Sequence, residues 1–101
     1  MAVTERRILI VGLGLIGGSL AAALRAAGFR GPILSCDPDP DEIARGVEMG
    51  LIERGATELA SVIEGASLIV LAVPVLAMRG VLAELAGCLE RAAPEVVITD
   101  V

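Results

Sequence analysis

Short unbroken aliphatic runs recur along the chain, and more polar segments of helical length separate them. The runs cover residues 7–11, 33–36 and 67–72, with weaker ones at 51–53 and 96–99. Unbroken aliphatic runs are typical of parallel strands buried on both faces, whereas half-exposed strands alternate between apolar and polar positions. The pattern therefore predicts five strands of a parallel sheet.

The segments between these runs carry helix signals. Asp39 suits the N-cap of a helix that has Pro40 in its first turn. Glu42 lies three residues after Asp39 and predicts a capping box, and Gly50 is expected to close this helix. The other predicted helices cover residues 15–27, 58–63 and 75–91.

Strands that alternate with helices predict right-handed βαβ crossovers and one doubly wound α/β domain over residues 1–101. We expect the strand order 3-2-1-4-5, counted along the chain, with two helices on each face. A complete sheet of this kind has a sixth strand, so residues 96–98 would form an apolar edge able to associate with other chains. We therefore expect a domain truncated after its fifth strand, whose substrate and dimerisation domain lies outside this chain.

A glycine-rich turn, Gly-Leu-Gly-Leu-Ile-Gly at residues 12–17, directly follows the first predicted strand. Gly12 allows a tight turn, Gly14 lets a diphosphate approach the backbone, and Gly17 lets the next helix pack closely on the strand. The N–H groups that open this helix would bind the diphosphate. Because the chain has 12 glycines, the spacing carries weight only with its context: a strand before, a helix after and an acid about 20 residues on.

Asp37 supplies that acid, at the end of the second predicted strand. In dinucleotide-binding folds a carboxylate at this place accepts hydrogen bonds from the adenosine ribose hydroxyls. The alternative is a solvated turn residue, because Asp and Pro alternate from Asp37 to Asp41, as is common where a turn leads into a helix. The spacing favours the ribose contact and a Rossmann-type sheet.

The same carboxylate predicts a preference for NAD over NADP. The 2′-phosphate of NADP would place negative charge beside Asp37 and Asp39, and residues 32–41 contain no arginine or lysine. A like-charge contact at about 4 Å costs about 4 kcal/mol at an effective dielectric constant of about 20. NAD is therefore the expected cofactor.

Composition argues against several other classes of function. A net charge of −5 and a single aromatic residue, Phe29, argue against a nucleic-acid partner. The chain has no histidine, and Cys36 and Cys88 have the spacing of neither a zinc site nor a disulfide framework. We expect no metal site, and two buried cysteines rather than nucleophiles, in a protein of the reducing cytoplasm.

The uncharged segment from Ile8 to Leu24 follows two arginines and so resembles a secretory signal peptide. Its four glycines suit an apolar leader helix poorly, and its 17 residues are at the lower limit for spanning a bilayer. We therefore prefer a strand, a turn and a helix, with no membrane association.

Ala72, Val73 and Pro74 follow the fourth predicted strand, at the edge where open α/β sheets bind ligands. We expect this segment to flank the cofactor, while Pro74 is equally suited to ending a strand and starting a helix. The glutamates are expected on the solvent-exposed surface, at positions 48, 53, 58, 64, 84 and 90.

Several stretches together resemble one family, the prephenate and arogenate dehydrogenases of tyrosine biosynthesis. Val-Gly-Leu-Gly-Leu-Ile-Gly-Gly-Ser-Leu at residues 11–20 is more specific than the glycine spacing alone. The other similar stretches are Cys-Asp at 36–37, Leu-Ala-Val-Pro-Val at 71–75 and Ile-Thr-Asp-Val at 98–101. The resemblance covers essentially the whole chain.

This resemblance implies the NAD-binding part of an oxidoreductase. The parent enzyme, a homodimer, would pass a hydride from the ring carbinol of prephenate or arogenate to the nicotinamide, release carbon dioxide and make the ring aromatic. The family uses a histidine for the hydroxyl proton, so we expect no catalytic residue in this chain and no turnover by it alone. The resemblance also places Asp100 near the nicotinamide. The cofactor-binding residues carried over are Gly12, Leu13, Gly14, Leu15, Ile16, Gly17, Asp37, Ala72, Val73 and Pro74.

Two other interpretations stay open. Another Rossmann NAD(P)-dependent enzyme, such as a 3-hydroxyacid dehydrogenase or a pyrroline-carboxylate reductase, would share the glycine turn, although methionine is more typical there than Ile16. A non-catalytic nucleotide-binding module would equally lack acid and base groups.

Overall fold

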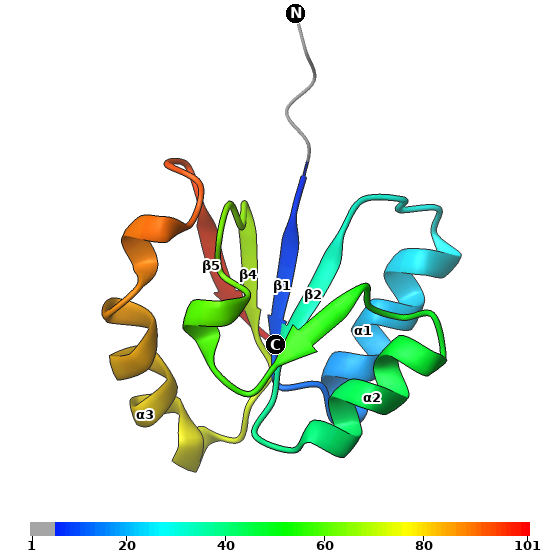
Figure 1. The fold of residues 1–101 in the computed structure, drawn as a ribbon, viewed down its shortest axis with the longest axis horizontal. Coiled ribbons are helices and arrows are strands. Elements are labelled where there is room, and N and C mark those ends of the chain that lie inside the picture. The colour runs from blue at the N-terminus through cyan, green and yellow to red at the C-terminus, as the bar shows by residue number, and fades with distance from the viewer. Residues whose placement is uncertain (1–5) are drawn as a thin grey trace, which may run out of the picture.

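The computed structural model describes residues 6–101, which form a five-stranded parallel sheet with helices on both faces (Figure 1). The strands are β1 (Ile8–Val11), β2 (Ile33–Cys36), β3 (Arg54–Ala56), β4 (Leu68–Leu71) and β5 (Val97–Asp100). Their spatial order is β3-β2-β1-β4-β5. The predicted Rossmann-type sheet in the order 3-2-1-4-5 is therefore confirmed.

Three α-helices cover the sheet. Helices α1 (Leu15–Ala26) and α2 (Pro40–Glu48) lie on one side, and α3 (Val75–Ala86) lies on the other (Figure 1). Two 3-10 turns, η1 (Leu59–Ser61) and η2 (Leu89–Arg91), pack on the same face as α3. The second face therefore carries one α-helix and two short turns in place of the two predicted helices.

The core explains the aliphatic runs. All four residues of β1 are buried, and they alternate between the two faces of the sheet. Leu9 and Val11 pack with η1 and α3, whereas Ile8 and Ile10 pack with α1 and the segment after α2. Burying one such side chain stabilises the fold by about 1.5–3 kcal/mol, so a strand with apolar residues on both faces has to lie inside the sheet.

Two predicted boundaries are wrong. The helix expected over 75–91 ends at Gly87, and η2 follows as a separate turn. The strand expected at 51–53 lies three residues later, as β3 at Arg54–Ala56. The apolar residue behind the prediction, Ile52, is buried in the core cluster beneath α1 and α2 but precedes the strand. A Cβ atom at Gly55 would lie 2.8 Å from the carbonyl oxygen of Ser35, so this edge strand contains a small residue where it approaches β2.

The predicted capping box of α2 is also wrong, although its N-cap is confirmed. The Asp39 side chain accepts a hydrogen bond from the Asp41 N–H at 2.9 Å, as an N-cap residue should. Glu42 forms an ion pair with Arg45 at 3.0 Å, and the N–H of Asp39 donates to Asp37. Asp37 therefore accepts the hydrogen bond from the Asp39 N–H that the glutamate of a capping box would accept.

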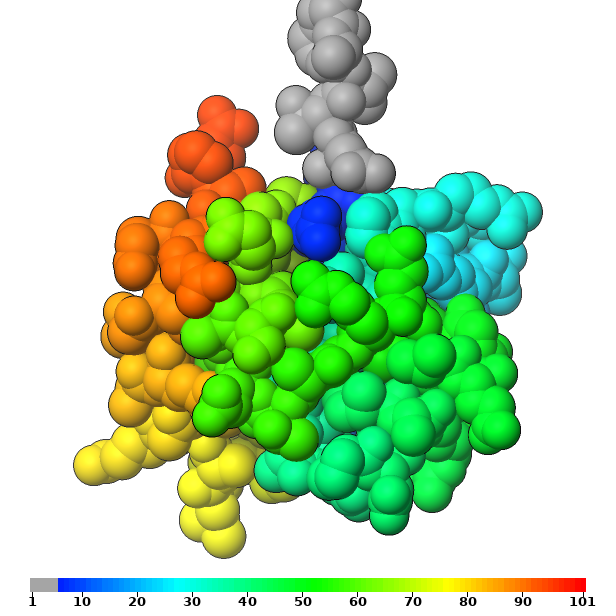
Figure 2. Space-filling model, viewed as in Figure 1, coloured from blue at the N-terminus to red at the C-terminus, as the bar shows by residue number. Residues whose placement is uncertain are grey.

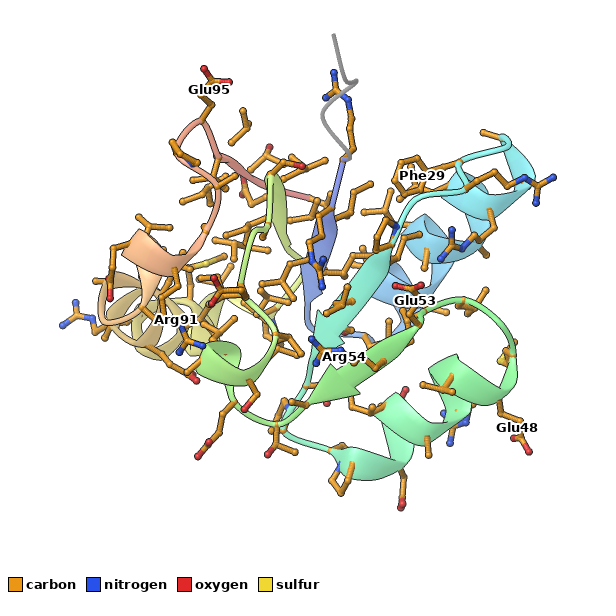
Figure 3. All side chains as sticks on the ribbon, turned by 45° about the horizontal axis from the view of Figure 1, so that its top comes forward. Phe29, Glu48, Glu53, Arg54, Arg91 and Glu95 are labelled. Carbon is orange, nitrogen blue, oxygen red and sulfur yellow. The ribbon has the colours of Figure 1, made fainter. Side chains whose placement is uncertain are left out.

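The leader-like segment folds as β1, the glycine turn and most of α1. In the part of the chain that the structure describes, no helix is long and apolar enough to cross a bilayer. The six surface glutamates are exposed as predicted, and Figure 3 shows Glu48 pointing away from the sheet. Two of the six also make contacts: Glu84 accepts a hydrogen bond from the Leu59 N–H, and Glu64 pairs with Arg91.

Strand β5 lies at the edge of the sheet next to β4, and all four of its residues are exposed. The predicted apolar edge is therefore present, with Val97 and Ile98 on it. Association through this edge stays a prediction.

A pair of glycine substitutions tests how tightly α1 packs on the turn. A Cβ atom at Gly17 would overlap the backbone carbonyl of Gly12, whereas one at Gly80 in α3 would have no described atom within 4 Å apart from its chain neighbours and the nearby backbone of α3. We expect Gly17→Ala to lower the free energy of unfolding by about 1–3 kcal/mol, because backbone cannot rotate away. Gly80→Ala should raise it by about 0.5–1 kcal/mol. Urea titration of both variants measures the difference, and equal stability would contradict the packing.

Candidate functional site

The glycine turn connects β1 to α1 at the carboxyl edge of the sheet. Gly12 has a φ of +93°, which side-chain-bearing residues rarely adopt, and its N–H donates to the Cys36 carbonyl at 2.7 Å. A Cβ atom there would lie 2.6 Å from the carbonyl oxygen of Ala72. Gly12 therefore stands where the ends of β1, β2 and β4 meet.

A cavity of about 520 Å³ opens beside this turn. Of the ten predicted cofactor-binding residues, the structure brings eight together on its walls: Gly12, Gly14, Leu15, Ile16, Asp37, Ala72, Val73 and Pro74. The volume lies within the range of small-molecule sites, about 300–1,000 Å³. The segment after β4 and the turn after β1 therefore face one space, although they lie sixty residues apart in sequence.

Leu13 and Gly17 do not line the cavity. The Leu13 side chain is buried in the core cluster beneath α1 and α2, so only its backbone faces the turn. Gly17 packs against the Gly12 carbonyl and Ile10, which is the packing role expected of the third glycine. Asp100 also lies outside the lining, at the end of β5 beside Leu71, and its neighbour Val101 lines the cavity instead.

Sequence reasoning missed six residues of the cavity wall. Cys36 ends β2 directly before Asp37, and Val81 lies one helical turn beyond Ala77 on α3. No local signal marks Val101, because only the pairing of β4 with β5 brings it to this edge. The missed residues are Val11, Cys36, Pro38, Ala77, Val81 and Val101.

The helices that open onto the cavity differ in their N-termini from the one that does not. Within residues 6–101, α1 and α3 have neither a capping side chain nor an acid in the first turn, whereas α2 has Asp39, Asp41 and Glu42. The first N–H groups of a helix have no intrahelical partner and carry partial positive charge. The two helix N-termini that face the cavity therefore have no acidic side chain that would repel or compete with an anionic ligand.

Side chains at these two helix ends are apolar and exposed. In Figure 2 the first turn of α3, yellow at the lower left, projects from the surface, and Val75 and Leu76 in it are 86% and 98% exposed. Leu15, in the first turn of α1, is 88% exposed. Of these three residues, Leu15 lines the cavity, beside the N–H groups that open α1.

Asp37 has the single side-chain carboxylate among the described residues that line the cavity, and it is 8% exposed. Its Oδ2 accepts a hydrogen bond from the Leu13 N–H at 2.7 Å, and its Oδ1 accepts one from the Asp39 N–H at 2.9 Å. Asp37 is therefore buried rather than solvated, although its contact with the Asp39 N–H is that of a turn residue. The contact to Leu13 was not predicted, because nothing in the local sequence joins positions 24 residues apart.

Cys36 and Cys88 are both buried, as predicted. Burial, followed by the negative charges of Glu84 and Asp37, raises the pKa of the Cys36 thiol from 9.0 to about 12. Since the thiolate is the reactive form, Cys36 is poorly suited to nucleophilic chemistry.

Alkylation tests this assignment of Cys36. In a Cys88→Ala variant at pH 8, we expect the folded protein to react with iodoacetamide at least about 100-fold more slowly than the urea-unfolded protein, because only about one thiol in ten thousand would be ionised. The rate should rise with pH through pH 10 without levelling, whereas an ordinary thiol levels near pH 9. Equal rates in the two states would contradict the raised pKa.

Comparisons with known proteins agree with this geometry. The family model described as prephenate dehydrogenase, nucleotide-binding domain, matches residues 20–101. The prephenate dehydrogenase of A. aeolicus, solved in complex with hydroxyphenyl propionate and NAD+, is 32% identical over 99% of this chain, with a TM-score of 0.85. A second structure of prephenate dehydrogenase from Aquifex aeolicus is 31% identical over 92% of this chain, with a TM-score of 0.79.

These matches cover 34% and 33% of the two solved chains, so this chain spans about a third of their length. A diketoreductase, 18% identical with a TM-score of 0.72 over 98% of this chain and 42% of its own, shares the fold alone. Because the family model matches most of its length, this chain belongs to the prephenate dehydrogenase family, as a nucleotide-binding domain.

Proposed function

We propose that the cavity binds NAD, with the diphosphate at the N-terminus of α1 and the adenosine ribose at Asp37. The observation that carries this proposal is the presence, in one cavity, of an uncapped helix start, an unobstructed glycine and a buried carboxylate. Gly12, Gly14, Leu15 and Ile16 present backbone to the diphosphate. The segment from Ala72 to Pro74 flanks the cofactor from the opposite side.

The residues present fit such a ligand. Apart from Gly14 and its two chain neighbours, no described residue has an atom within 4 Å of a Cβ built on Gly14, so the backbone there can be approached closely. The described lining residues include no arginine, so only helix N–H groups and the dipoles of α1 and α3 meet the charge of a diphosphate. Val73, Ala77 and Val81 add apolar side chains to the wall of the cavity.

For the whole protein, we propose an NAD-dependent prephenate or arogenate dehydrogenase that acts as a homodimer. The support is family membership together with the NAD+ and hydroxyphenyl propionate bound by the A. aeolicus enzyme. When bound, NAD accepts the hydride in this chemistry. This chain's residues bind and orient the cofactor, while the substrate pocket and the group that takes the hydroxyl proton belong to a part of the protein outside these 101 residues.

Calorimetric titration tests the cofactor. We expect NAD to bind at least about tenfold more tightly than NADP, because the 2′-phosphate would meet the carboxylate of Asp37. The titration uses this chain at moderate salt with both nucleotides. Equal affinity, or preference for NADP, would overturn the assignment of Asp37 to the ribose.

Substitution at Gly14 tests where the diphosphate lies. We expect Gly14→Ala to weaken NAD binding by about tenfold or more, because the new methyl group occupies the space that the diphosphate needs. Its free energy of unfolding should change by no more than about 1 kcal/mol. Gly80→Ala is the matched control, since its methyl group also meets no described atom but lies outside the cavity. Unchanged affinity in Gly14→Ala would place the diphosphate elsewhere.

Activity tests the parent enzyme. The protein extended to the length of its relatives should reduce NAD when given prephenate or arogenate, and the substrate that it oxidises faster names its specificity. Absence of NADH formation with both substrates, in a protein that still binds NAD, would instead favour a nucleotide-binding module without catalysis.

A further inference from the structure

Two hydrogen bonds join the glycine turn to the end of β2. The N–H of Gly12 donates to the Cys36 carbonyl at 2.7 Å, and the N–H of Leu13 donates to Oδ2 of Asp37, also at 2.7 Å. The first is a backbone hydrogen bond, which the carbonyl group of any residue at position 36 could accept. The second depends on the side chain of one residue.

The Asp37 contact is tertiary and strong. It joins residues 24 apart and is buried, whereas the Asp39 contact is a local turn of the kind that aspartates commonly form. Hydrogen bonds to a charged group are worth about 1.5–3 kcal/mol, roughly twice a neutral one. The core holds the Leu13 side chain in place. The hydrogen bond to Asp37 holds the N–H of the same residue, and so sets the orientation of its peptide group.

Asp37 keeps capacity for a ligand while it does this. A carboxylate offers about four lone-pair sites, and backbone N–H groups occupy two of them in this structure. The remaining sites are available to ribose hydroxyls. One carboxylate can therefore contact the turn and the sugar together.

We infer that Asp37 is a positioning residue for the diphosphate. Its carboxylate holds the Leu13 peptide, and with it the backbone of the turn, in the conformation that binds the diphosphate, whether or not a ribose hydroxyl is present. This inference rests on the proposed function for its ligand. It adds a role that acts through the backbone to the direct ribose contact.

Nucleotides with and without ribose hydroxyls separate the two roles. If Asp37 acted on the ribose alone, Asp37→Ala would weaken ADP binding and leave binding of 2′,3′-dideoxy-ADP unchanged. We expect Asp37→Ala to weaken the dideoxy nucleotide as well, by about tenfold, since the turn loses its charged partner. Asp37→Asn should restore part of this loss, because its amide oxygen can still accept from the Leu13 N–H.

Two control variants isolate the contact. Asp39→Asn removes a carboxylate two residues away and keeps a good N-cap, so it controls for charge. Ser35→Ala removes another buried side-chain bond of β2, from Ser35 Oγ to the Ile10 carbonyl at 2.8 Å, and so controls for lost stability. Neither side chain bonds to Leu13, and neither variant should weaken dideoxy-ADP by more than about twofold.

Amide hydrogen exchange without nucleotide gives an independent readout. We compare the exchange rate of the Leu13 N–H with that of the core amide of Leu9 in each protein. This relative rate should be at least about tenfold higher in Asp37→Ala than in the native chain, and it should be unchanged in both control variants. Unchanged exchange together with unchanged dideoxy-ADP affinity would overturn the inference and leave the proposed function intact. If the native chain bound neither NAD nor ADP, the proposed function would fail, and with it the assignment of the ligand.

Discussion

The close approach of three backbone segments at Gly12 is the constraint on which the site depends. Its carbonyl lies against Gly17, its Cα faces the Ala72 carbonyl, and its N–H bonds to Cys36. A side chain at position 12 or 17 would force these segments apart. Because they cannot separate, α1 has to begin directly above the end of β1, and its first N–H groups open onto the cavity between β1, β2 and β4. The direction of the helix, and hence the sign of the potential in the cavity, follows from this contact.

The site attracts an anion without a cationic side chain among its described lining residues. The two α-helices that point at the cavity carry no acid in their first turns, while the acids of this region gather on α2. Asp37 is the exception, and it is held by two backbone donors. The site thus treats the two parts of a dinucleotide differently. Helix N-termini bind the anionic diphosphate, and the carboxylate faces the neutral sugar. A phosphate on that sugar would meet the carboxylate instead.

Much of this could be predicted from sequence, because the informative signals are local. Aliphatic runs locate β1, β2 and β4. The glycine spacing, Asp37 and the segment that ends the fourth strand together locate eight wall residues of the cavity. What could not be predicted depends on tertiary contacts. Strand β3 has an exposed arginine, a glycine and an alanine, and it pairs because β2 offers an edge. The bond from Leu13 to Asp37 depends on the pairing of β1 with β2, and the place of Val101 on the wall depends on the pairing of β4 with β5.

A crystal structure of this chain with NAD tests the central claim most directly. We expect electron density for the diphosphate within hydrogen-bonding distance of the N–H groups that open α1, with a ribose hydroxyl on Asp37 and the bond from Leu13 to Asp37 retained. A second groove, lined by residues of α1 and α2, shares Gly14 and Leu15 with the cavity. Density for the nucleotide in that groove, or an Asp37 side chain turned away from both ribose and turn, would contradict the account.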